Sequence, residues 1–399
     1  MSTRNSFRLV LARALSGLGI AWHIFGITLI LVVATELSFA GLQKLREKPT
    51  LRVRLLDARL AAQDNPPGLR EEHIAQEDSR LKFEEFAYWR RDPMASATLN
   101  IDGRGFRRTY NPVPDASDVI KIFVMGGSTI WGWNSRDDFT IPSQLSKLAS
   151  RHGFKVHVTN YGQTGYVTRQ EAIALMNAIG SGERPNLVVL LNGLNDVESS
   201  IFNSRAGTTF WFWSREWWFR RMFEGTTNAD GLTTLWRNTA TYQFLTPADT
   251  SEPEVEDYRV RTLARRIAGQ YASSVASVDG LASAFGFQPF FYLQPILFTK
   301  KKLTTVERNL IPVASNHFLR AGNRALFLEA YKQIGLTMKS NPRFKDIEGL
   351  FMDTDELVYS DGQHYSEKAN QVIAEAIFED LREPLQHLSE TSATATVLK

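Results

Sequence analysis

Residues 119–132 read Val-Ile-Lys-Ile-Phe-Val-Met-Gly-Gly-Ser-Thr-Ile-Trp-Gly. The first seven form a mostly apolar run rich in β-branched side chains, which predicts a buried strand over Val119–Met125. The two glycines that follow predict a tight turn, with Ser128 at the start of a helix. A hydroxyl held between a strand and a helix in this way is well placed to act as a nucleophile.

Similar apolar runs recur along the chain and alternate with helical patterns. Strands are expected at Lys155–Asn160, Leu187–Leu191, Pro289–Leu293 and Leu350–Met352. Helices are expected at Ile141–Arg151, Thr168–Ile179, Glu254–Phe285, Ala321–Met338 and Glu367–Leu381. This alternation predicts an α/β fold, with a parallel sheet between two layers of helices. In such sheets ligands bind beyond the carboxyl ends of the strands, so we expect the functional side chains there.

Composition excludes several classes of protein. The chain has 399 residues, of which 43% are hydrophobic and 22% charged, and its net charge is +3. These values predict a folded protein, and they are too balanced for one that coats nucleic acid. The absence of cysteine excludes disulfides, cysteine-ligated metals and thiol catalysis. The histidines lie far apart and no His-Glu-x-x-His pair is present, so we expect no metal site of that type.

The N-terminal region contains a candidate membrane segment. Residues 14–35 carry no formal charge, and roughly 20 such residues are enough for a helix to cross a bilayer. Ser38-Phe39-Ala40 also fits the cleavage site of a signal peptide, but the apolar stretch is long for one, and we expect an uncleaved anchor. Both interpretations place the rest of the chain outside the cytoplasm. We therefore expect a single-pass protein of the cell membrane, with its main domain on the periplasmic or extracellular side.

The expected organisation has four parts. Residues 1–42 form a cytoplasmic stub and the anchor, and residues 43–116 a stalk and docking segment. This stalk leans towards helix over 43–95 and contains a turn at Asp102-Gly103. Residues 117–384 form the main domain, with an aromatic insertion at about 199–250, and residues 385–399 a flexible tail.

Polar blocks follow the expected strands or precede the last expected helix. They are Asn160-Tyr-Gly-Gln-Thr-Gly165, Asn192-Gly-Leu-Asn-Asp196 and Asp361-Gly-Gln-His364. A serine hydroxyl needs a base such as His364, and a carboxylate three residues away can orient the imidazole ring. Asparagine amides and glycine N–H groups are suitable donors to an oxyanion. The alternatives are that Ser128 is a turn residue or part of a phosphate cradle, and that Asp361 only caps the last helix.

The Gly126–Gly132 turn with Ser128 and these three blocks, in this order, resemble the four sequence blocks of the SGNH (GDSL-type) hydrolase superfamily. The resemblance covers residues 117–384 and implies a flavodoxin-like fold and ester cleavage through an acyl-serine. It implies Ser128 as the nucleophile, with Asp361 and His364 as the other catalytic residues. Ser128, Gly165 and Asn195 would form the oxyanion hole, and Asp196 would brace its loop.

One position departs from the family pattern. The family usually has Asp before the serine, where this chain has Gly127. The Gly-Gly-Ser-Thr form is similar to a group of membrane-anchored bacterial members of the superfamily. The upstream Asn-x-x-Gly-x-Gly-Phe-Arg segment, residues 100–107, is similar to that group as well.

The function expected from these residues is a serine ester hydrolase that needs no metal or cofactor. Its substrate would be an ester of a carbohydrate or lipid at the cell envelope, with no nucleic acid among its partners; protein partners are not indicated. Transfer of the acyl group to a polysaccharide hydroxyl would use the same residues. A non-catalytic domain that binds carbohydrate is the alternative of another class, but it would not need the whole Ser/Gly/Asn/Asp/His set.

The aromatic insertion is unusual. Residues 202–223 contain nine Trp or Phe side chains. They could form a small separate core, a wall for a sugar or acyl chain, or a belt on the bilayer surface. We expect Trp131, Trp211 and Trp213 to contact substrate. The lysines at 300–302 are expected in a solvated loop that could also meet an anionic polymer or lipid headgroups.

Overall fold

The computed structural model describes residues 22–42, 80–116, 118–224, 257–310 and 321–397, together with 236, 239, 241 and 242. The chain divides into two compact units. The smaller unit comprises Met1–Leu51 and Glu216–Glu252, and the larger one comprises Arg52–Arg215 and Pro253–Lys399. The larger unit contains all the polar blocks identified in the sequence.

Within the described residues, five strands form one parallel sheet in the larger unit. Across the sheet they are β4 (Val156–Asn160), β3 (Ile120–Gly126), β5 (Leu187–Asn192), β6 (Gln288–Leu293) and β7 (Phe344–Asp346). Counted along the chain, this order is 2-1-3-4-5, which is that of flavodoxin-like folds, with a switch point between β3 and β5. The residues of β3 and β5 are almost all buried, as expected for parallel strands covered on both faces.

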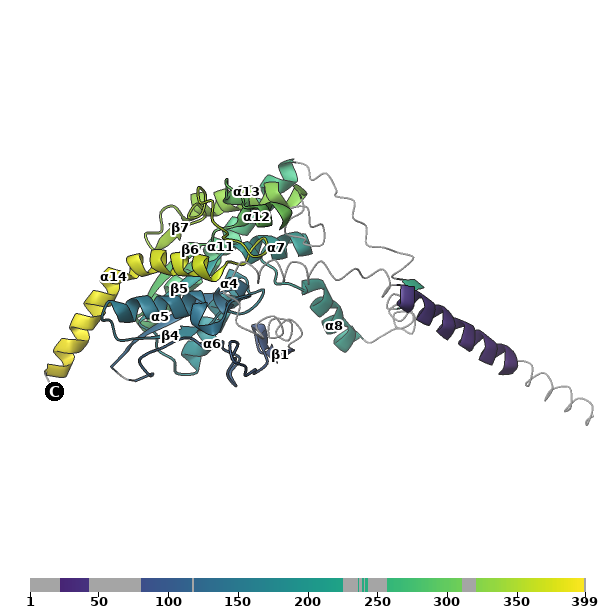
Figure 1. Cartoon of the computed structure of the whole chain (residues 1–399), viewed down its shortest axis with the longest axis horizontal. Coiled ribbons are helices and arrows are strands. Elements are labelled where there is room, and N and C mark those ends of the chain that lie inside the picture. Colours follow the sequence, from purple (N-terminus) through teal and green to yellow (C-terminus); the bar gives the residue numbers. More distant parts are fainter. Residues whose placement is uncertain are drawn as a thin grey trace, which may run out of the picture. The chain divides into compact units, whose positions relative to one another are not determined.

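Helices cover both faces of the sheet (Figure 1). On one face α5 (Ile141–Arg151) packs against α14 (Glu367–Val397). On the other, α11 (Asp257–Phe285) packs against α6 (Thr168–Gly180) and α13 (Ala321–Met338). The predicted three-layer fold is therefore confirmed, and most expected elements lie within a few residues of their predicted bounds.

Shorter elements lie at the ends of the strands or connect them. They are α4 (Ser128–Trp131), the 3-10 helices η1 (Asp137–Phe139) and η2 (Leu297–Thr299), α7 (Leu194–Asn203), α8 (Phe212–Glu224) and α12 (Thr305–Leu310). Helices α4 and α7 directly follow β3 and β5, so both begin at the carboxyl edge of the sheet.

The last strand was predicted at the wrong place. The strand is Phe344–Asp346, whereas Leu350–Met352 lie in a turn. Strand β7 pairs only with β6, and two of its three residues are exposed, so it lacks the apolar run that marks a central strand. Phe351 is buried in the turn and its ring contacts Tyr359 and Tyr365, which explains an apolar triplet without a strand.

The end of the stalk is an antiparallel hairpin and not a helix. Strands β1 (Leu81–Glu84) and β2 (Tyr88–Arg91) pair with each other, and Phe86 and Tyr88 have positive φ at the turn. The Trp89 indole is buried and donates to the Thr164 carbonyl oxygen at 2.9 Å, so the hairpin packs against the sheet domain. The expected turn at Asp102-Gly103 is present, whereas the stalk residues 43–79 lie outside the described part of the chain.

The C-terminal segment is helical over most of its length. Helix α14 continues to Val397, so residues 385–397, expected in a flexible tail, are its last turns. Leu385 is fully buried and Leu388 packs on the core, which gives the helix a reason to extend beyond its predicted end at Leu381.

The smaller unit contains a long apolar helix, Trp22–Leu42. By length and composition this helix could cross a membrane, and none of the apolar window that defines it is buried within the structure. A signal sequence near an N-terminus has the same properties. The first part of the predicted segment, residues 14–21, lies outside the described residues.

Candidate active site

The site lies at the carboxyl edge of the sheet, where β3, β4 and β5 end. Gly126, the last residue of β3, and Gly127, which follows it, allow a turn that a larger residue could not make without displacing its neighbours. A Cβ on Gly126 would lie 2.5 Å from Ile130 Cγ1 and 2.6 Å from the Leu191 carbonyl oxygen. A Cβ on Gly127 would overlap the side-chain nitrogen of Asn195. Glycine at position 127 therefore accompanies close approach of the Asn195 amide.

A chain of hydrogen bonds joins Ser128, His364 and Asp361. His364 Nε2 lies 2.7 Å from Ser128 Oγ, and His364 Nδ1 lies 2.6 Å from Asp361 Oδ2. The other oxygen of Asp361 accepts hydrogen bonds from the backbone N–H groups of Gln363 and His364, at 3.0 and 2.8 Å. The carboxylate is thus fixed by its own loop and fixes the ring in turn. With a proton on Nδ1, Nε2 is free to accept the serine proton.

These three side chains differ in exposure. His364 and Asp361 are buried, whereas Ser128 is half-buried. The sequence places Ser128 more than two hundred residues from the other two, and the fold brings them into contact. Ser128 is therefore the most exposed of the three residues.

Candidate oxyanion donors lie beside Ser128. The Asn195 side-chain nitrogen donates to the Tyr166 carbonyl oxygen at 2.8 Å, which uses one of its two hydrogens. The backbone N–H groups of Ser128 and Gly165 donate to no acceptor among the described residues. Gly165 has a φ of +75°, which favours glycine, and a Cβ there would lie 3.3 Å from the Phe210 ring. These three groups are the oxyanion donors that the resemblance implied, and their role stays a prediction.

Asp196 and the first turn of α6 are tied together. The Asp196 carboxylate accepts hydrogen bonds from the hydroxyl of Thr168 at 2.8 Å and from its backbone N–H at 3.2 Å. Burial raises the pKa of Asp196 to about 6, although the Thr168 hydrogen bonds oppose this shift. The bracing role expected for Asp196 thus corresponds to a link between two helices. One is α7, which carries Asn195, and the other is α6, which begins three residues after Gly165.

Two further acids near these helices were not singled out by sequence. Glu198 lies on α7 one turn after Asn195, is half-buried, and makes no hydrogen bond or ion pair with a described residue. Burial, and secondarily the charge of Asp361, raises its pKa to about 7. Glu171 on α6 is fully buried and accepts a hydrogen bond from Asn192 at 2.7 Å. Burial raises its pKa well above the ordinary range.

Trp133 covers the histidine and was missed by the sequence argument. Its ring stacks on the His364 ring, with centroids 5.7 Å apart and an angle of 26° between the planes. The Arg91 guanidinium from the hairpin lies 5.5 Å from the Trp133 ring centroid. The only signal in the sequence was an aromatic residue five positions after Ser128.

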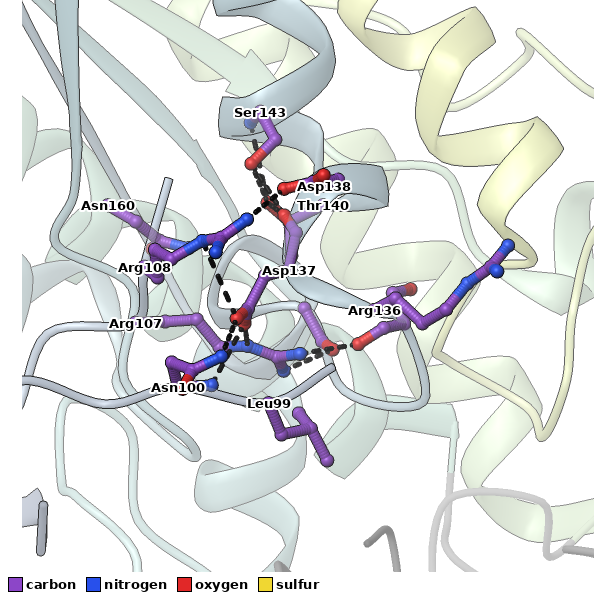
Figure 2. A network of polar contacts seen from close by, with 12 residues as sticks. Leu99, Asn100, Arg107, Arg108, Arg136, Asp137, Asp138, Thr140, Ser143 and Asn160 are labelled. Atoms are coloured by element: carbon purple, nitrogen blue, oxygen red, sulfur yellow. Dashed lines mark hydrogen bonds and ion pairs between the residues drawn. The ribbon is translucent and has the colours of Figure 1, made fainter. Parts of the chain in front are cut away.

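The Asn100–Arg107 segment holds the loop that carries Trp133, and Figure 2 shows Asn100 and Arg107 beside Asp137 of this loop. The buried Arg107 guanidinium donates to Asp137 Oδ1 at 2.8 Å and to the carbonyl oxygens of Gly132 and Ser135 at 2.9 and 2.5 Å. The Asn100 amide donates to the other oxygen of Asp137 at 2.8 Å. This upstream segment therefore holds the 132–137 loop in place, and that loop carries Trp133 against the His364 ring.

The same loop also contacts the segment after His364. The Arg136 guanidinium donates to both carboxylate oxygens of Glu367, at 3.0 and 2.7 Å, and the Asn370 amide donates to Ser135 Oγ at 2.8 Å. These contacts join the serine side of the site to the start of α14, three and six residues beyond His364.

A buried ion pair supports the other side of the histidine loop. Lys300 Nζ lies 2.6 Å from Glu307 Oε2, and both side chains are fully buried. Glu307 Oε1 accepts hydrogen bonds from the backbone N–H groups of Val358 and Tyr359 at 3.0 and 3.1 Å. The expectation that Lys300 lies in a solvated loop is therefore wrong, because its ammonium group is needed to neutralise Glu307. Lys301 is exposed, with its nitrogen 3.7 Å from Asp353.

The three tryptophans expected to contact substrate have different surroundings. Trp131 is fully buried, with the Arg107 guanidinium 4.8 Å from its ring centroid, so the structure leaves it no surface for a substrate. Trp211 is 47% exposed and its ring centroid lies 5.2 Å from that of Trp89. Trp213 is 53% exposed, and its indole donates to the Asn203 carbonyl oxygen at 3.2 Å. Trp131 was mispredicted because its proximity to Ser128 in sequence does not decide which way its ring points.

Among the described residues, no three His, Asp or Glu side chains are grouped as metal ligands would be. The fold and the site together define a class of protein. It is an α/β protein of flavodoxin-like strand order, with a Ser-His-Asp hydrogen-bond chain at the carboxyl edge of its sheet.

Comparison with known proteins gives structural likeness only. No protein-family model matches the chain, and no curated protein does. Similar solved structures include a carbohydrate acetylesterase family member from Sinorhizobium meliloti, with 13% identity over 67% of this chain and 100% of that one and a TM-score of 0.38. A member of the lipolytic protein G-D-S-L family from Veillonella parvula has 10% identity over 65% and 97%, with a TM-score of 0.37. A lipase/acylhydrolase from Enterococcus faecalis has 13% identity over 67% and 97%, with a TM-score of 0.34. Values this low carry no information about activity.

Proposed function

We propose that this chain is a serine ester hydrolase of the SGNH type. The observation that carries the proposal is the continuous hydrogen-bond chain from Ser128 Oγ through His364 to Asp361, at 2.7 and 2.6 Å. A serine hydroxyl at neutral pH is a weak nucleophile, and this arrangement supplies the base that activates it.

The proposed reaction has two stages. In the first, Ser128 Oγ attacks the ester carbonyl carbon while His364 Nε2 takes the serine proton, and the resulting imidazolium then protonates the leaving alcohol as its C–O bond breaks. In the second, His364 takes a proton from water, the hydroxide oxygen attacks the acyl-serine, and the proton returns to Ser128 as the acid leaves. Asp361 holds the ring in the tautomer that both stages need.

The oxyanion formed in each stage needs donors that are already in place. The N–H groups of Ser128 and Gly165 and the second amide hydrogen of Asn195 are assigned this role. It is supported by the absence of any acceptor for the two backbone groups among the described residues, and by the position of the Asn195 nitrogen against Gly127. Donors that are fixed before the reaction need no reorganisation as charge develops.

The substrate class is proposed as an acyl or acetyl ester of a carbohydrate or lipid at the cell envelope. Phe210 lies against Gly165, and the half-exposed Trp211 follows it directly, which offers an aromatic wall for a sugar ring or an acyl chain. Trp213 continues this exposed aromatic run. The apolar helix Trp22–Leu42 supports a membrane-anchored protein whose larger unit faces the periplasm or the exterior.

Labelling with a fluorophosphonate probe tests the nucleophile directly. The full chain, in detergent micelles, should be labelled, and the Ser128→Ala variant should not. Ser283→Ala is the matched control, because Ser283 is exposed on α11 and its hydroxyl only bonds the Asp279 carbonyl oxygen. Absence of labelling in the wild type, or labelling of Ser128→Ala, would contradict the proposal and favour a non-catalytic binding domain.

The acyl acceptor needs a second measurement. With an activated acetyl ester as donor, release of acetate in water alone supports hydrolysis. The reaction is then repeated with an oligosaccharide added as acceptor. If acetylated oligosaccharide forms in preference to acetate, the same Ser128 acyl-enzyme belongs to a polysaccharide O-acyltransferase.

A further inference from the structure

Helix α8 exposes large apolar side chains to solvent. Trp218 is 64% exposed, Phe219 63% and Met222 77%, and Trp217 is also exposed. By helical spacing Trp218, Phe219 and Met222 lie on one side of α8, and Glu216, Arg220 and Arg221 lie on the other. Soluble proteins rarely leave such a continuous apolar surface exposed unless it binds something.

The charged residues among these aromatic side chains are mainly basic. Arg221 lies with its guanidinium 4.5 Å from the Trp217 ring centroid, and Arg220 pairs with Glu216 at 3.0 Å. Tryptophan beside arginine suits the boundary of a bilayer, where the ring enters the headgroup region and the cation meets phosphate groups.

The position of α8 in the chain relates this surface to the apolar helix Trp22–Leu42. Residues from Glu216 onward belong to the same compact unit as the apolar helix Trp22–Leu42. Within that unit, the Thr241 backbone N–H donates to Glu36 Oε1 at 3.2 Å. Glu36 is the only Asp, Glu, Lys or Arg in the helix and lies six residues before its end. A carboxylate at that point of a membrane-spanning helix belongs near the water interface and not at the centre of the bilayer.

From these contacts we infer that α8 lies in the interface of a lipid bilayer containing anionic phospholipid, beside the end of the anchor that carries Glu36. Trp218, Phe219 and Met222 enter the boundary between headgroups and acyl chains, and Arg220 and Arg221 contact the headgroup phosphates. The inference rests on the anchor that forms part of the proposed function. It is independent of the chemistry assigned to Ser128.

The consequence is a second attachment of the chain to the membrane. Eight residues, 204–211, separate the end of α7, which carries Asn195, from the start of α8. The inferred attachment point therefore lies close in sequence to the helix that carries Asn195.

The absence of cysteine allows a direct test in the full chain. Single variants Trp218→Cys, Leu31→Cys and Met176→Cys can each carry an environment-sensitive NBD label. Leu31 and Met176 are both exposed, one on the apolar helix and one on α6 of the larger unit. The proteins are reconstituted in vesicles of phosphatidylcholine and phosphatidylglycerol that contain lipids spin-labelled at a shallow or a deep acyl position. The circular dichroism spectrum of each variant, compared with that of the unmodified chain, reports an intact fold.

We expect the shallow spin label to quench the probe at 218 several-fold more than the probe at 176, and the deep spin label to quench the probe at 31. Quenching at 31 without quenching at 218 would overturn the inference and leave the anchor intact. No quenching at either position would overturn both. Failure of the hydrolase proposal would appear only in the fluorophosphonate labelling of the unmodified chain.

The arginines are tested separately. Replacing both of them (Arg220→Glu, Arg221→Glu) should reduce shallow quenching at 218 several-fold and leave deep quenching at 31 unchanged. Unchanged quenching at 218 would remove the contact with headgroup phosphates from the inference.

Discussion

The Asn195 side-chain amide occupies the space that a Cβ of residue 127 would need. A larger residue next to Ser128 would therefore displace the amide from this backbone turn. The amide nitrogen is held there by its hydrogen bond to the Tyr166 carbonyl oxygen at 2.8 Å. A single side chain thus links the turns after β3, β4 and β5.

This relationship predicts that Gly127→Ala and Asn195→Ala have similar effects. Loss of one oxyanion donor typically lowers kcat by about 10²- to 10³-fold, and we expect this for each variant. Because both changes remove the same amide from its place, the double variant should be little worse than either single one. Ester hydrolysis kinetics on all three variants give the answer, and fully additive losses would show that residue 127 acts independently of Asn195.

The Ser128–His364–Asp361 chain predicts a graded loss of activity. By analogy with other triads, Ser128→Ala should lower kcat by about 10⁶-fold. Asp361→Asn should lower it by about 10⁴-fold, because the amide favours the wrong tautomer of the ring. Steady-state hydrolysis of an activated ester measures both. An Asp361→Asn variant with wild-type kcat would contradict the assigned role of the carboxylate.

The buried Lys300–Glu307 pair predicts a strong dependence of stability on Lys300. Lys300→Met leaves the Glu307 carboxylate buried without its cation and should lower the free energy of unfolding by about 3–5 kcal/mol. Lys301→Met is the matched control, because its exposed pair with Asp353 should contribute less than about 1 kcal/mol. Chemical denaturation in detergent measures both, and equal effects would show that the buried pair is not what supports the loop.

Glu307 also predicts how stability responds to acid. Burial by itself would raise its pKa, but the Lys300 ammonium and the backbone N–H groups outweigh this, so the folded pKa lies below the ordinary value of 4.5. Its stabilising contribution is therefore present above pH 4.5 and is lost as the pH falls through the folded pKa. In Lys300→Met this acid-induced loss should shrink, which thermal unfolding between pH 3 and 6 would reveal as a flatter profile.

Glu198 predicts the opposite dependence. Burial, followed by the charge of Asp361, raises its pKa from 4.5 to about 7. The folded protein then holds a proton that the unfolded chain has released, so stability falls as the pH rises from about 4.5 to 7. Glu198→Gln should remove this part of the decline and be more stable than wild type at pH 8. A profile parallel to that of the wild type would show that Glu198 ionises normally.

The contact between Arg136 and Glu367 predicts a positioning effect. Glu367→Gln removes the charge from a two-point pair that joins the loop after Ser128 to the start of α14, and we expect a loss of about 1–3 kcal/mol in stability. If the pair positions His364, kcat should fall while KM for a small ester stays constant. Exposed Glu375→Gln on the same helix is the control and should change neither quantity.

Much of the fold was predictable because its strands are short apolar runs bounded by glycine and polar residues. Parallel strands buried on both faces leave this signal in β3 and β5. Among the described strands, β7 pairs with β6 alone and is mostly exposed, so its sequence has no apolar run. The turn at Leu350–Met352 is apolar and contains the buried Phe351, so its sequence resembles that of a buried strand. The hairpin at Leu81–Arg91 was missed because its strands are short, charged and paired mainly with each other.

The sequence by itself determined the order of the four blocks and the residue types that could perform acyl chemistry, because strand ends and glycine turns are local features. Only the tertiary structure decided that Ser128, His364 and Asp361 meet, that Trp131 points inward and that Trp133 covers the histidine. It also decided that Lys300 is buried on Glu307. These outcomes depend on contacts between residues that are distant in sequence, or on which way a side chain turns within its loop, and packing sets both.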